Sequence, residues 1–534
     1  MTSRRAALLP FGNGSIGTVL LENAELAPDA PFLVFDQGDE STSYSYAEAV
    51  VLAQRGQAVL RSMGVATGDH FAIATRNRSE FFACWFGAAL IGAVMVPASP
   101  GSSPDELAYV LDHARCGAVL VEAGNEALEA AARRGGAAVI TTGADFAERA
   151  SQALQPIQVR GVDPGAAMSI MYTSGTTSRP KGVVVTHANY LYAGESVAQN
   201  LRMRPDDRWL VVLPTFHANA QYYSIMSSLV TGASVAVMER FSASRWASQA
   251  RTYNATLGSL FAAPIRMILA QPPGEAEHEN RLRAVCFAQN LTQNELDEFE
   301  RRFTAPLLQL YGMTETIAPP TMNPLFGRRN NLTIGRPVIS TQLRVVTDDG
   351  REAGLGETGE LLVQGDPGIT LMAGYFNDSD ATEETLKDGW LHTGDIVRLE
   401  AGGFLSFYDR ARDIIKRGGE IVATAEVERV IAEHPAVRES AAVAVPDEML
   451  DQALKVVVVR KLGQEVTEQD LIQHCRDRLS SFKVPSFIEF VDALPHTSVG
   501  KVRKADLRTV VHERDAASRS YADASEKEDP EGEP

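Results

Sequence analysis

Short apolar runs and amphipathic segments alternate along the chain up to about residue 340. The runs HFAIATR (70–76), GAVLVEA (117–123) and SVAVME (234–239) have the length and composition of buried strands, and helical patterns such as 105–114 lie between them. Alternation of this kind favours parallel sheets covered by helices. We therefore expect a body in which α/β sheets are stacked.

The pattern changes beyond about residue 340. TQLRVVTDDG, GELLVQG and GFLSFYDR indicate strands that end in Gly and Asp turns, which is typical of antiparallel hairpins. The predicted fold class is α/β, with a large N-terminal body of stacked sheets, a small β-barrel-like part and a small α+β C-terminal domain. The expected bounds are 1–408 for the body, 409–412 for a hinge, 413–512 for the small domain and 513–534 for an acidic, disordered tail.

Two segments allow more detailed predictions. Residues 81–96 (FFACWFGAALIGAVMV) form the longest apolar run, which is too short for a membrane span and suits a helix and strand buried inside a domain. Residues 467–479 (TEQDLIQHCRDRL) predict an amphipathic helix, for which Thr467 and Asp470 make a capping box.

Composition and charge argue against several classes of protein. Fifty basic and 68 acidic side chains give a net charge of −18, which argues against a general nucleic-acid surface. Cys84, Cys116, Cys286 and Cys475 lie far apart without a CxxC pair, so neither a disulfide framework nor a zinc site is expected. We expect a cytoplasmic protein without a membrane span. The oligomeric state is left open, and a homodimer is one state that the sequence allows.

The stretch YTSGTTSRPKG, residues 172–182, carries the first chemical signal. It is rich in hydroxyl groups around one glycine and ends on a lysine, and strand-like segments flank it on both sides. Exposed N–H groups in such a turn form an anion-binding nest, to which the lysine adds a positive charge. The loop predicts a phosphate site, with a polar surface hairpin as the alternative.

Further segments accompany this loop in a fixed order. They are PTFH (214–217), YGMTET (311–316), WLHTGD (390–395), DRARDIIKRGGE (409–420) and PHTSVGKVRK (495–504). Together the motifs resemble those of the adenylate-forming superfamily, which includes acyl- and aryl-CoA synthetases, adenylation domains of peptide synthetases and firefly luciferase. The resemblance covers residues 15–512, and between His217 and Pro273 the chain is most similar to crotonobetaine/carnitine–CoA ligases.

The resemblance implies an ATP-dependent acyl-CoA synthetase. Such an enzyme activates a carboxylic acid as acyl-AMP with release of pyrophosphate, and then transfers the acyl group to coenzyme A with release of AMP. The first step brings negative charge onto the α-phosphate, so it depends on cations and rigid positioning. The expected cofactors are ATP, Mg²⁺ and coenzyme A.

The resemblance also assigns roles to individual residues. Glu315 is similar to the family's magnesium ligand, and Thr314 would hold the α-phosphate. Tyr311 would offer a flat face for adenine, and Asp395 would accept both ribose hydroxyls. The residues assigned to ATP or AMP are Thr173, Ser174, Gly175, Thr176, Thr177, Lys181, Gln289, Asn290, Tyr311, Gly312, Met313, Thr314, Asp395 and Arg410. The residues assigned to catalysis are Lys501, Thr314, Glu315 and His217.

The small domain is implied to serve both half-reactions. Lys501 would bridge the carboxylate and the α-phosphate during adenylation. Arg412 matches the hinge about which the mobile small domain rotates after acyl-AMP forms, and this rotation would bring in the tunnel for the thiol. The tunnel residues are Lys416, Arg417, Gly418, Gly419 and Glu420.

The resemblance implies that the PTFH segment and its neighbours form the pocket for the acyl group. Relatives that activate amino acids carry an aspartate where this chain has His217, so an organic or fatty carboxylic acid is favoured over an α-amino acid. His217 would lie at the mouth between this pocket and the thiol tunnel. The residues assigned to the pocket are Phe216, His217, Gln221, Tyr222 and Phe287.

Two departures from the family pattern keep alternatives open. GGEIVATAEVE replaces the usual GGEN-I-S/Y-P-x-E, with Ile421, Ala423 and Thr424 at the changed positions, and CFAQN (286–290) replaces a segment of small residues. One alternative is an enzyme specialised in thioesterifying a supplied acyl-adenylate, and another is a free-standing enzyme that loads a carrier protein. A nucleotide-binding protein without turnover is disfavoured, because Lys501, Glu315 and Asp395 are all kept.

Overall fold

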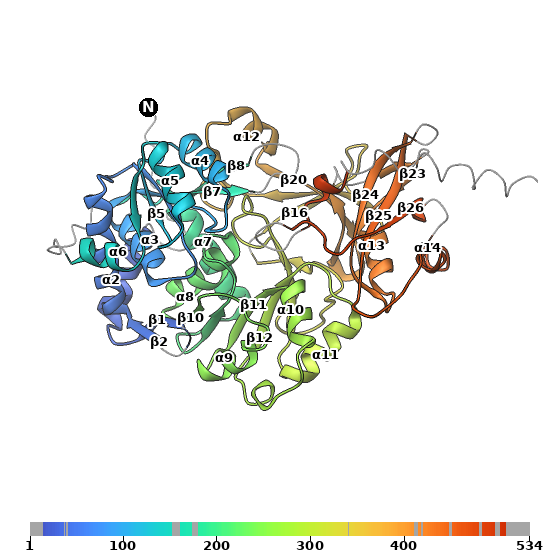
Figure 1. Cartoon of the computed structure of the whole chain (residues 1–534), viewed down its shortest axis with the longest axis horizontal. Helices are drawn as coiled ribbons and strands as arrows, with labels where there is room; N and C mark the ends of the chain where they lie inside the picture. Colours follow the sequence, from blue (N-terminus) through green and yellow to red (C-terminus); the bar gives the residue numbers. More distant parts are fainter. Residues whose placement is uncertain are drawn as a thin grey trace, which may run out of the picture. The chain divides into compact units, whose positions relative to one another are not determined.

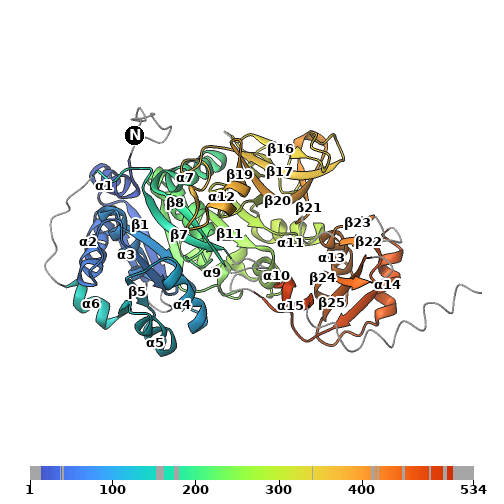
Figure 2. The same cartoon turned by 90° about the horizontal axis from the view of Figure 1, so that it is seen from above.

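The structure is a computed structural model of the chain. It describes residues 14–36, 38, 41–151, 161–173, 180–339, 341–410, 415–417, 420–447, 451–479, 483–496 and 502–508. The chain divides into two compact units, a large one that ends at Phe407 and a small one that begins at Tyr408. Figures 1 and 2 show their elements, coloured along the sequence. The predicted α/β class is confirmed, and each unit is described by itself.

A nine-stranded sheet forms the centre of the large unit (Figure 1). Its order is β15-β14-β13-β12-β11-β9-β10-β1-β2, and the six strands from β13 to β1 run parallel. The strands β2, β14 and β15 at its edges are antiparallel to their neighbours. The bounds are β1 Pro31–Asp36, β2 Ser41–Ser45, β9 Arg208–Val211, β10 Ser234–Met238, β11 Leu257–Phe261, β12 Ala284–Ala288, β13 Leu307–Tyr311, β14 Thr321–Met322 and β15 Arg336–Pro337.

A seven-stranded sheet carries the hydroxyl-rich loop. Its order is β18-β8-β7-β4-β3-β5-β6, parallel from β7 to β6, with β8 and β18 antiparallel at one edge. The bounds are β3 His70–Ala74, β4 Val94–Pro97, β5 Ala118–Val121, β6 Ala138–Thr141, β7 Ala167–Thr173, β8 Lys181–Thr186 and β18 Gly374–Tyr375. The edge strand β18 comes from much later in the chain than the others, so this sheet is completed only by a distant segment.

Helices cover both sheets, as the alternating pattern predicts. Their bounds are α1 Ile16–Leu26, α2 Tyr46–Ser62, α3 Ser79–Ile91, α4 Pro104–His113, α5 Glu126–Arg134, α6 Ala144–Ala150, α7 His187–Leu201, η1 Asn219–Ile225, α8 Met226–Thr231, α9 Trp246–Thr252, α10 Ala262–Leu269, η2 Glu275–Glu277, α11 Gln293–Phe303 and α12 Ser379–Thr385. Residues 81–96 form the end of α3 and then β4, and every residue of α3 from Phe81 onward is buried. The prediction of a buried helix and strand is confirmed.

Helices α2 and α3 cross at two glycines, and Figure 2 shows them side by side. A Cβ atom on Gly56 would lie 1.8 Å from the Ala83 carbonyl oxygen, and one on Gly87 would lie 2.6 Å from the Gln57 nitrogen. The missing side chains therefore let the two backbones touch, which places α3 deep in the main hydrophobic cluster of the large unit.

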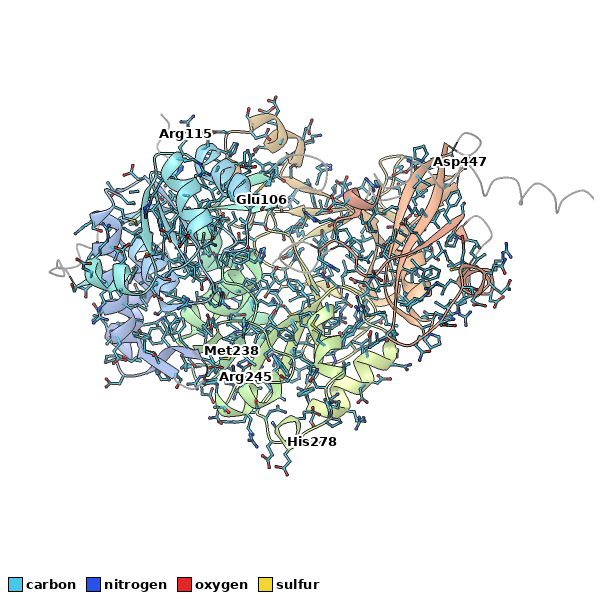
Figure 3. The ribbon with its side chains drawn as sticks, in the orientation of Figure 1. Glu106, Arg115, Met238, Arg245, His278 and Asp447 are labelled. Atoms are coloured by element: carbon cyan, nitrogen blue, oxygen red, sulfur yellow. The ribbon has the colours of Figure 1, made fainter. Side chains whose placement is uncertain are left out.

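A second hydrophobic cluster fills the other face of the nine-stranded sheet, beneath α9, α10 and α11 (Figure 1). Beside it, the buried Asp36 carboxylate at the end of β1 accepts hydrogen bonds from Arg245 at 3.1 Å and from Gln249 at 2.6 Å. Arg245, labelled in Figure 3, precedes α9. A buried carboxylate needs such partners, so this pair joins β1 to α9.

An antiparallel sheet follows beyond residue 340, where hairpins are predicted. Its order is β16-β17-β20-β19, and β21 pairs with β20. The bounds are β16 Leu343–Val346, β17 Thr358–Gln364, β19 Leu386–Lys387, β20 Trp390–Leu399, the short helix η3 Ala401–Gly403 and β21 Leu405–Arg410.

The small unit is an α+β structure with its own core. A three-stranded sheet, in the order β24-β25-β26, packs with a hairpin and two helices around a cluster that includes Val427, Val456 and Leu471. The bounds are β22 Ile415–Arg417, β23 Glu420–Val422, α13 Thr424–Ala432, β24 Val437–Asp447, β25 Asp451–Arg460, α14 Glu468–Arg476, β26 Phe487–Phe490 and α15 Lys504–Arg508. The capping box of Thr467 and Asp470 begins α14, so that prediction is confirmed.

Candidate active site

Strands β7 and β8 frame the hydroxyl-rich loop. Thr173 pairs with Lys181 at the last position of the antiparallel ladder, and the Thr173 hydroxyl donates to the Lys181 carbonyl at 3.5 Å. The loop therefore leaves and re-enters the sheet at adjacent points. Ser174, Gly175, Thr176 and Thr177 lie outside the described residues.

Lys181, Tyr375 and Glu315 meet beside this loop. The Lys181 ammonium lies 4.8 Å from the centroid of the Tyr375 ring, and the Tyr375 hydroxyl donates to Glu315 Oε1 at 2.9 Å. Burial, and after it the Glu315 carboxylate, raise the pKa of Tyr375, so the phenol is held as a donor. Lys181 and Glu315, which belong to two motifs, thus both contact a tyrosine that no quoted motif indicates.

The segment 311–316 leaves β13 and turns sharply. The Met313 N–H donates to the Thr316 hydroxyl at 3.0 Å, which closes a tight turn around the half-buried Thr314. Glu315 is only 5% exposed. A Cβ on Gly312 would lie 2.4 Å from the Tyr223 hydroxyl, so glycine is required here by the close approach of that buried tyrosine.

Tyr311 and Asp395 come from two different motifs and form a hydrogen bond. The Tyr311 hydroxyl donates to Asp395 Oδ2 at 2.6 Å, and both residues are buried. The Asp395 N–H donates to the Thr393 hydroxyl, which in turn donates to the Leu361 carbonyl of β17. The carboxylate proposed for the ribose therefore lies beside the ring proposed for adenine.

The segment after PTFH forms a π-helix, η1, in which the Met226 N–H donates to the Gln221 carbonyl five residues earlier. Helices of this kind are rare and occur frequently at functional sites. The buried Gln221 accepts from the Tyr190 hydroxyl and donates to the Thr215 carbonyl at 2.6 Å. The ring of Tyr222 packs edge-on against Tyr190.

Other pocket and gate candidates lie nearby in sequence. Phe216 and His217 are half-buried, and their ring centroids are 4.3 Å apart. The Tyr222 side chain is fully buried, and its hydroxyl has no hydrogen-bond partner among the described residues. Burial raises the pKa of Tyr222 well above its ordinary range.

Phe287 lies on the opposite face of β12 from these tyrosines. Its side chain is 1% exposed and belongs to the cluster beneath α9, α10 and α11, whereas Cys286 belongs to the cluster that contains Tyr222 and Tyr223. Successive side chains of a strand point to opposite faces, so these two neighbours line different cores. Phe287 therefore packs into the cluster beneath α9, α10 and α11, and its assignment to the acyl pocket stays a prediction.

Gln289 and Asn290 follow β12, and the backbone at Gln289 has an unusual conformation. Gln289 has a φ of +77°, and its carbonyl accepts from the Gln309 amide at 3.1 Å. The Asn290 carbonyl accepts from Arg266 at 2.8 Å. Residues other than glycine adopt positive φ mainly at special positions, which fits a segment shaped for a ligand.

In the small unit, residues on both sides of Lys501 in the sequence make contacts that hold them in place. His496 and Val502 form an antiparallel bridge, and the Lys504 ammonium donates to the Thr424 hydroxyl at 2.7 Å and lies 2.9 Å from Glu428 Oε1. Thr424, one of the departures from the family pattern, therefore contacts a residue that lies close to Lys501 in the sequence.

Several predicted residues of the small unit fall outside the described part of the chain. Lys501, Arg412, Gly418 and Gly419 do so, as does the predicted tail. Lys416 and Arg417 belong to β22, Glu420 begins β23 and Arg410 ends β21.

The donor set suits a magnesium ion bound together with a nucleotide. No cluster of three or more His, Cys, Asp or Glu side chains that could hold a metal occurs among the described residues. Mg²⁺ in nucleotide sites is held by one or two carboxylates plus phosphates and water, so Glu315 alone is a sufficient protein ligand. Its buried carboxylate, oriented by Tyr375, fits that role.

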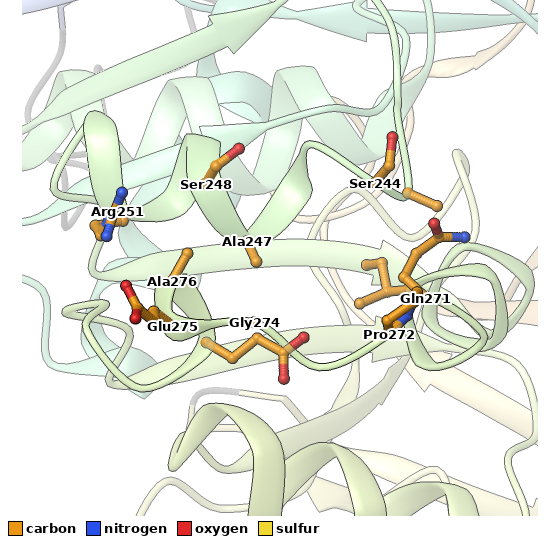
Figure 4. A pocket seen from close by; sticks show the side chains of 12 residues that line it. Ser244, Ala247, Ser248, Arg251, Gln271, Pro272, Gly274, Glu275 and Ala276 are labelled. Carbon is orange, nitrogen blue, oxygen red and sulfur yellow. The ribbon is translucent and has the colours of Figure 1, made fainter.

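A hollow of about 300 Å³ lies between α9 and the segment around η2 (Figure 4). None of the predicted site residues lines it. Arg251, which lines it, is already paired with Glu279 at 2.7 Å, and the remaining lining residues are uncharged apart from Glu275 and Glu277. We assign it no function.

The fold, with its motif residues at β7–β8, Glu315 and Asp395, is shared with the ligases that activate an acid with ATP. More particularly, the chain belongs to the AMP-binding enzyme family. The family's sequence profile matches residues 20–376, and that of the AMP-binding enzyme C-terminal domain matches 426–501. The resemblance stated from the motifs is confirmed.

Relatives of known name cover nearly the whole chain. The crotonobetaine/carnitine–CoA ligase of Proteus mirabilis is 34% identical over 502 residues, which cover 91% of this chain and 97% of that protein. ATP-bound MatB from Rhodopseudomonas palustris has a TM-score of 0.85 at 26% identity, covering 93% of this chain and 98% of that one. O-succinylbenzoate CoA synthetase (MenE) from Bacillus subtilis, in complex with ATP and magnesium ion, has a TM-score of 0.81 at 28% identity, covering 93% and 99%.

Proposed function

We propose that the protein is an AMP-forming acid–thiol ligase that makes acyl-coenzyme A. A carboxylate oxygen of the acid attacks the α-phosphorus of ATP, the bond to the β-phosphate breaks and pyrophosphate leaves. The sulfur of coenzyme A then attacks the acyl carbon, the thiol proton is released and AMP departs. The observation that carries the proposal is the Tyr311–Asp395 hydrogen bond. It brings together the tyrosine proposed to contact adenine and the aspartate proposed to bind the ribose.

In the first half-reaction the large unit would hold the nucleotide. The loop between β7 and β8 would bind the phosphates with Lys181, Thr314 would contact the α-phosphate, and Asp395 would accept the ribose hydroxyls. Glu315 would bind Mg²⁺, which when present neutralises charge on the phosphates. Buried and pre-oriented groups of this kind stabilise developing charge more than groups in water do.

The small unit would supply the residues that distinguish the two half-reactions. Lys501 would bridge the carboxylate and the α-phosphate during adenylation, and rotation at Arg412 would then bring in residues 416–420 for the thiol. The hydrogen bond of Lys504 to Thr424 and its ion pair with Glu428 support this proposal, because they hold a residue close to Lys501 in the sequence. One site would thereby serve both reactions.

The substrate we propose is a carboxylic acid that carries a polar or charged group, bound near η1. Gln221, Tyr222 and the half-buried Phe216 and His217 supply aromatic faces and a buried amide in one short segment. Aromatic faces attract quaternary ammonium groups. Crotonobetaine and carnitine, after which the P. mirabilis relative is named, are therefore the first acids to test.

The test separates the half-reactions. Lys501→Ala is expected to reduce ATP–pyrophosphate exchange by about 10²–10³-fold, because one charge-stabilising group is lost from the transition state. It should leave thioester formation from supplied acyl-adenylate nearly unchanged. Lys461→Ala, the same substitution at an exposed lysine of the small unit, serves as the control. Full ATP-dependent activity in Lys501→Ala would contradict the assignment.

The same assays distinguish the alternatives. An enzyme specialised in the second step would form thioester from acyl-adenylate without exchanging pyrophosphate, and an enzyme that loads a carrier protein would not release free acyl-CoA. A panel of acids assayed for both steps decides among them.

We propose a reducing, cytoplasmic location for the protein. All four cysteines are buried and free, as expected where disulfides do not form. No helix within the described residues is long and apolar enough to cross a bilayer. The homodimer stays a prediction, which sedimentation of the purified chain would test.

A further inference from the structure

Tyr375 lies outside the motif segments quoted from the sequence, yet it touches two groups that are proposed to bind the metal and the phosphates. We propose that Tyr375 is a positioning residue with two separable functions. Its hydroxyl fixes the Glu315 carboxylate for Mg²⁺, and its ring holds the Lys181 ammonium toward the phosphates. This inference rests on the proposed function, because it takes Glu315 as the metal ligand and Lys181 as a phosphate ligand.

The backbone fixes Tyr375 to the strand that leaves the hydroxyl-rich loop. Tyr375 pairs with Val183 in the β18–β8 ladder, and the next residue, Phe376, donates its N–H to the Gly182 carbonyl at 2.7 Å. The Tyr375 N–H donates to the Thr382 hydroxyl at 2.8 Å. With its main chain held on both sides, the ring has a defined position beside Lys181.

The same segment also holds the glutamate. The Met372 N–H donates to the Glu315 carbonyl at 3.0 Å, and the Tyr375 hydroxyl donates to Oε1 of the Glu315 side chain at 2.9 Å. A carboxylate has two oxygens with several lone pairs, so a hydrogen bond to one oxygen sets the plane of the group while it binds a cation. Partners of metal-binding carboxylates commonly raise metal affinity 10–100-fold.

The aromatic face serves the lysine in a different way. At 4.8 Å from the ring centroid, the Lys181 ammonium is within the range of a cation–π interaction. A neutral ring attracts the ammonium without neutralising it, so the charge stays available to the phosphates. An acidic neighbour in the same place would have competed with them.

A tyrosine with only a structural role would stabilise the fold to the same extent with or without metal. The proposed role instead predicts a change in the coupling between metal and nucleotide. This coupling is the ratio of the dissociation constants of α,β-methylene-ATP, a non-cleavable analogue, measured in EDTA and in saturating Mg²⁺. Calorimetric titration of the full chain gives both constants without turnover.

Tyr375→Phe should reduce the coupling about 10-fold while leaving affinity in EDTA within about 2-fold of the wild type, because only the hydroxyl is lost. Tyr375→Leu should reduce the coupling equally and also weaken binding in EDTA about 5-fold, because the ring that positions Lys181 is lost. Tyr46→Phe is the matched control, since the buried Tyr46 hydroxyl donates to the Ala233 carbonyl at 2.8 Å. It should change neither constant.

Glu315→Gln and Lys181→Met separate this inference from the proposed function. Glu315→Gln should nearly abolish the coupling, and Lys181→Met should weaken binding in EDTA. If Glu315→Gln left the coupling unchanged, the metal role of Glu315 itself would be wrong. If Glu315→Gln removed the coupling while Tyr375→Phe bound as the wild type does, the inference about Tyr375 alone would be overturned.

Discussion

At the scale of single residues, two tyrosine hydroxyls orient the two carboxylates on which the proposed chemistry depends. Tyr311 donates to Asp395 and Tyr375 donates to Glu315, at 2.6 Å and 2.9 Å. Hydrogen bonds to ionised acceptors are stronger than those between neutral groups, and in a buried site they also fix the direction of the acceptor. Both carboxylates are therefore oriented before a nucleotide binds.

His187 is another residue whose environment has a measurable consequence. It is fully buried at the start of α7, its Nδ1 accepts from the Ile16 N–H at 3.4 Å, and burial lowers its pKa to about 4, with Asp163 acting in the opposite direction. The neutral form is thus favoured in the folded protein. An unfolded histidine titrates near pH 6.5, so below this pH the unfolded chain binds the proton more readily.

Stability should accordingly fall as the pH decreases from 6.5 toward 4. Between pH 7 and pH 5 the contribution of His187 to the free energy of unfolding falls by about 2 kcal/mol. His187→Asn keeps an acceptor for Ile16 but does not titrate, so urea unfolding at the two pH values should show a smaller loss for the variant. Equal losses in both proteins would contradict the assignment.

At the scale of secondary-structure elements, the crossing of α2 and α3 depends on the absence of side chains. The gap at Gly56 is bounded by main-chain atoms of α3, which cannot rotate away as a side chain could. Any added group must separate the two helices and loosen the main cluster that surrounds α3.

Gly56→Ala should therefore destabilise the large unit by about 3 kcal/mol, at the upper end of the cost of overpacking a core. Gly117→Ala is the control, because a Cβ there meets no atom within 4 Å. The measurement is the urea concentration at which half of each variant is unfolded. The variants are compared where the free energy of unfolding depends on urea concentration with the same slope. A Gly56→Ala protein as stable as the control would show that α3 shifts without cost.

Elements that depend on near neighbours in the sequence could be predicted, whereas contacts made only by tertiary pairing could not. Local patterns sufficed for the buried α3–β4 segment and for the capping box of α14, because each depends on neighbours in sequence. The letters CFAQN do not reveal which strand face meets which core, so the sequence could not predict that Phe287 and Cys286 pack into different hydrophobic clusters. Tyr375 was missed because its partners, β8 and Glu315, are brought to it only by tertiary pairing.

At the scale of the whole molecule, the chain consists of two units with separate hydrophobic cores. Separate cores are what the proposed rotation of the small domain would require, because each core would stay intact during it. The proposed hinge at Arg412 would concentrate that change in very few backbone angles.

Arg412→Pro should leave pyrophosphate exchange within about 3-fold of the wild type and slow thioester formation at least about 10-fold, because proline fixes φ at the hinge. Each half-reaction is measured by the product formed at fixed times. Arg412→Lys is the control, because it keeps the positive charge and leaves the backbone free to rotate. Loss of both half-reactions to the same extent would remove Arg412 from the hinge.

The late strand β18 has one more consequence, for the order of events during synthesis. Strands β7 and β8 leave the ribosome long before Gly374 and Tyr375, so the growing chain presents its hydroxyl-rich loop without the partner that completes the sheet edge. A ribosome-bound fragment that stops short of Gly374 should therefore be unable to retain ATP. The enzyme would therefore bind the nucleotide only after most of its chain has been synthesised.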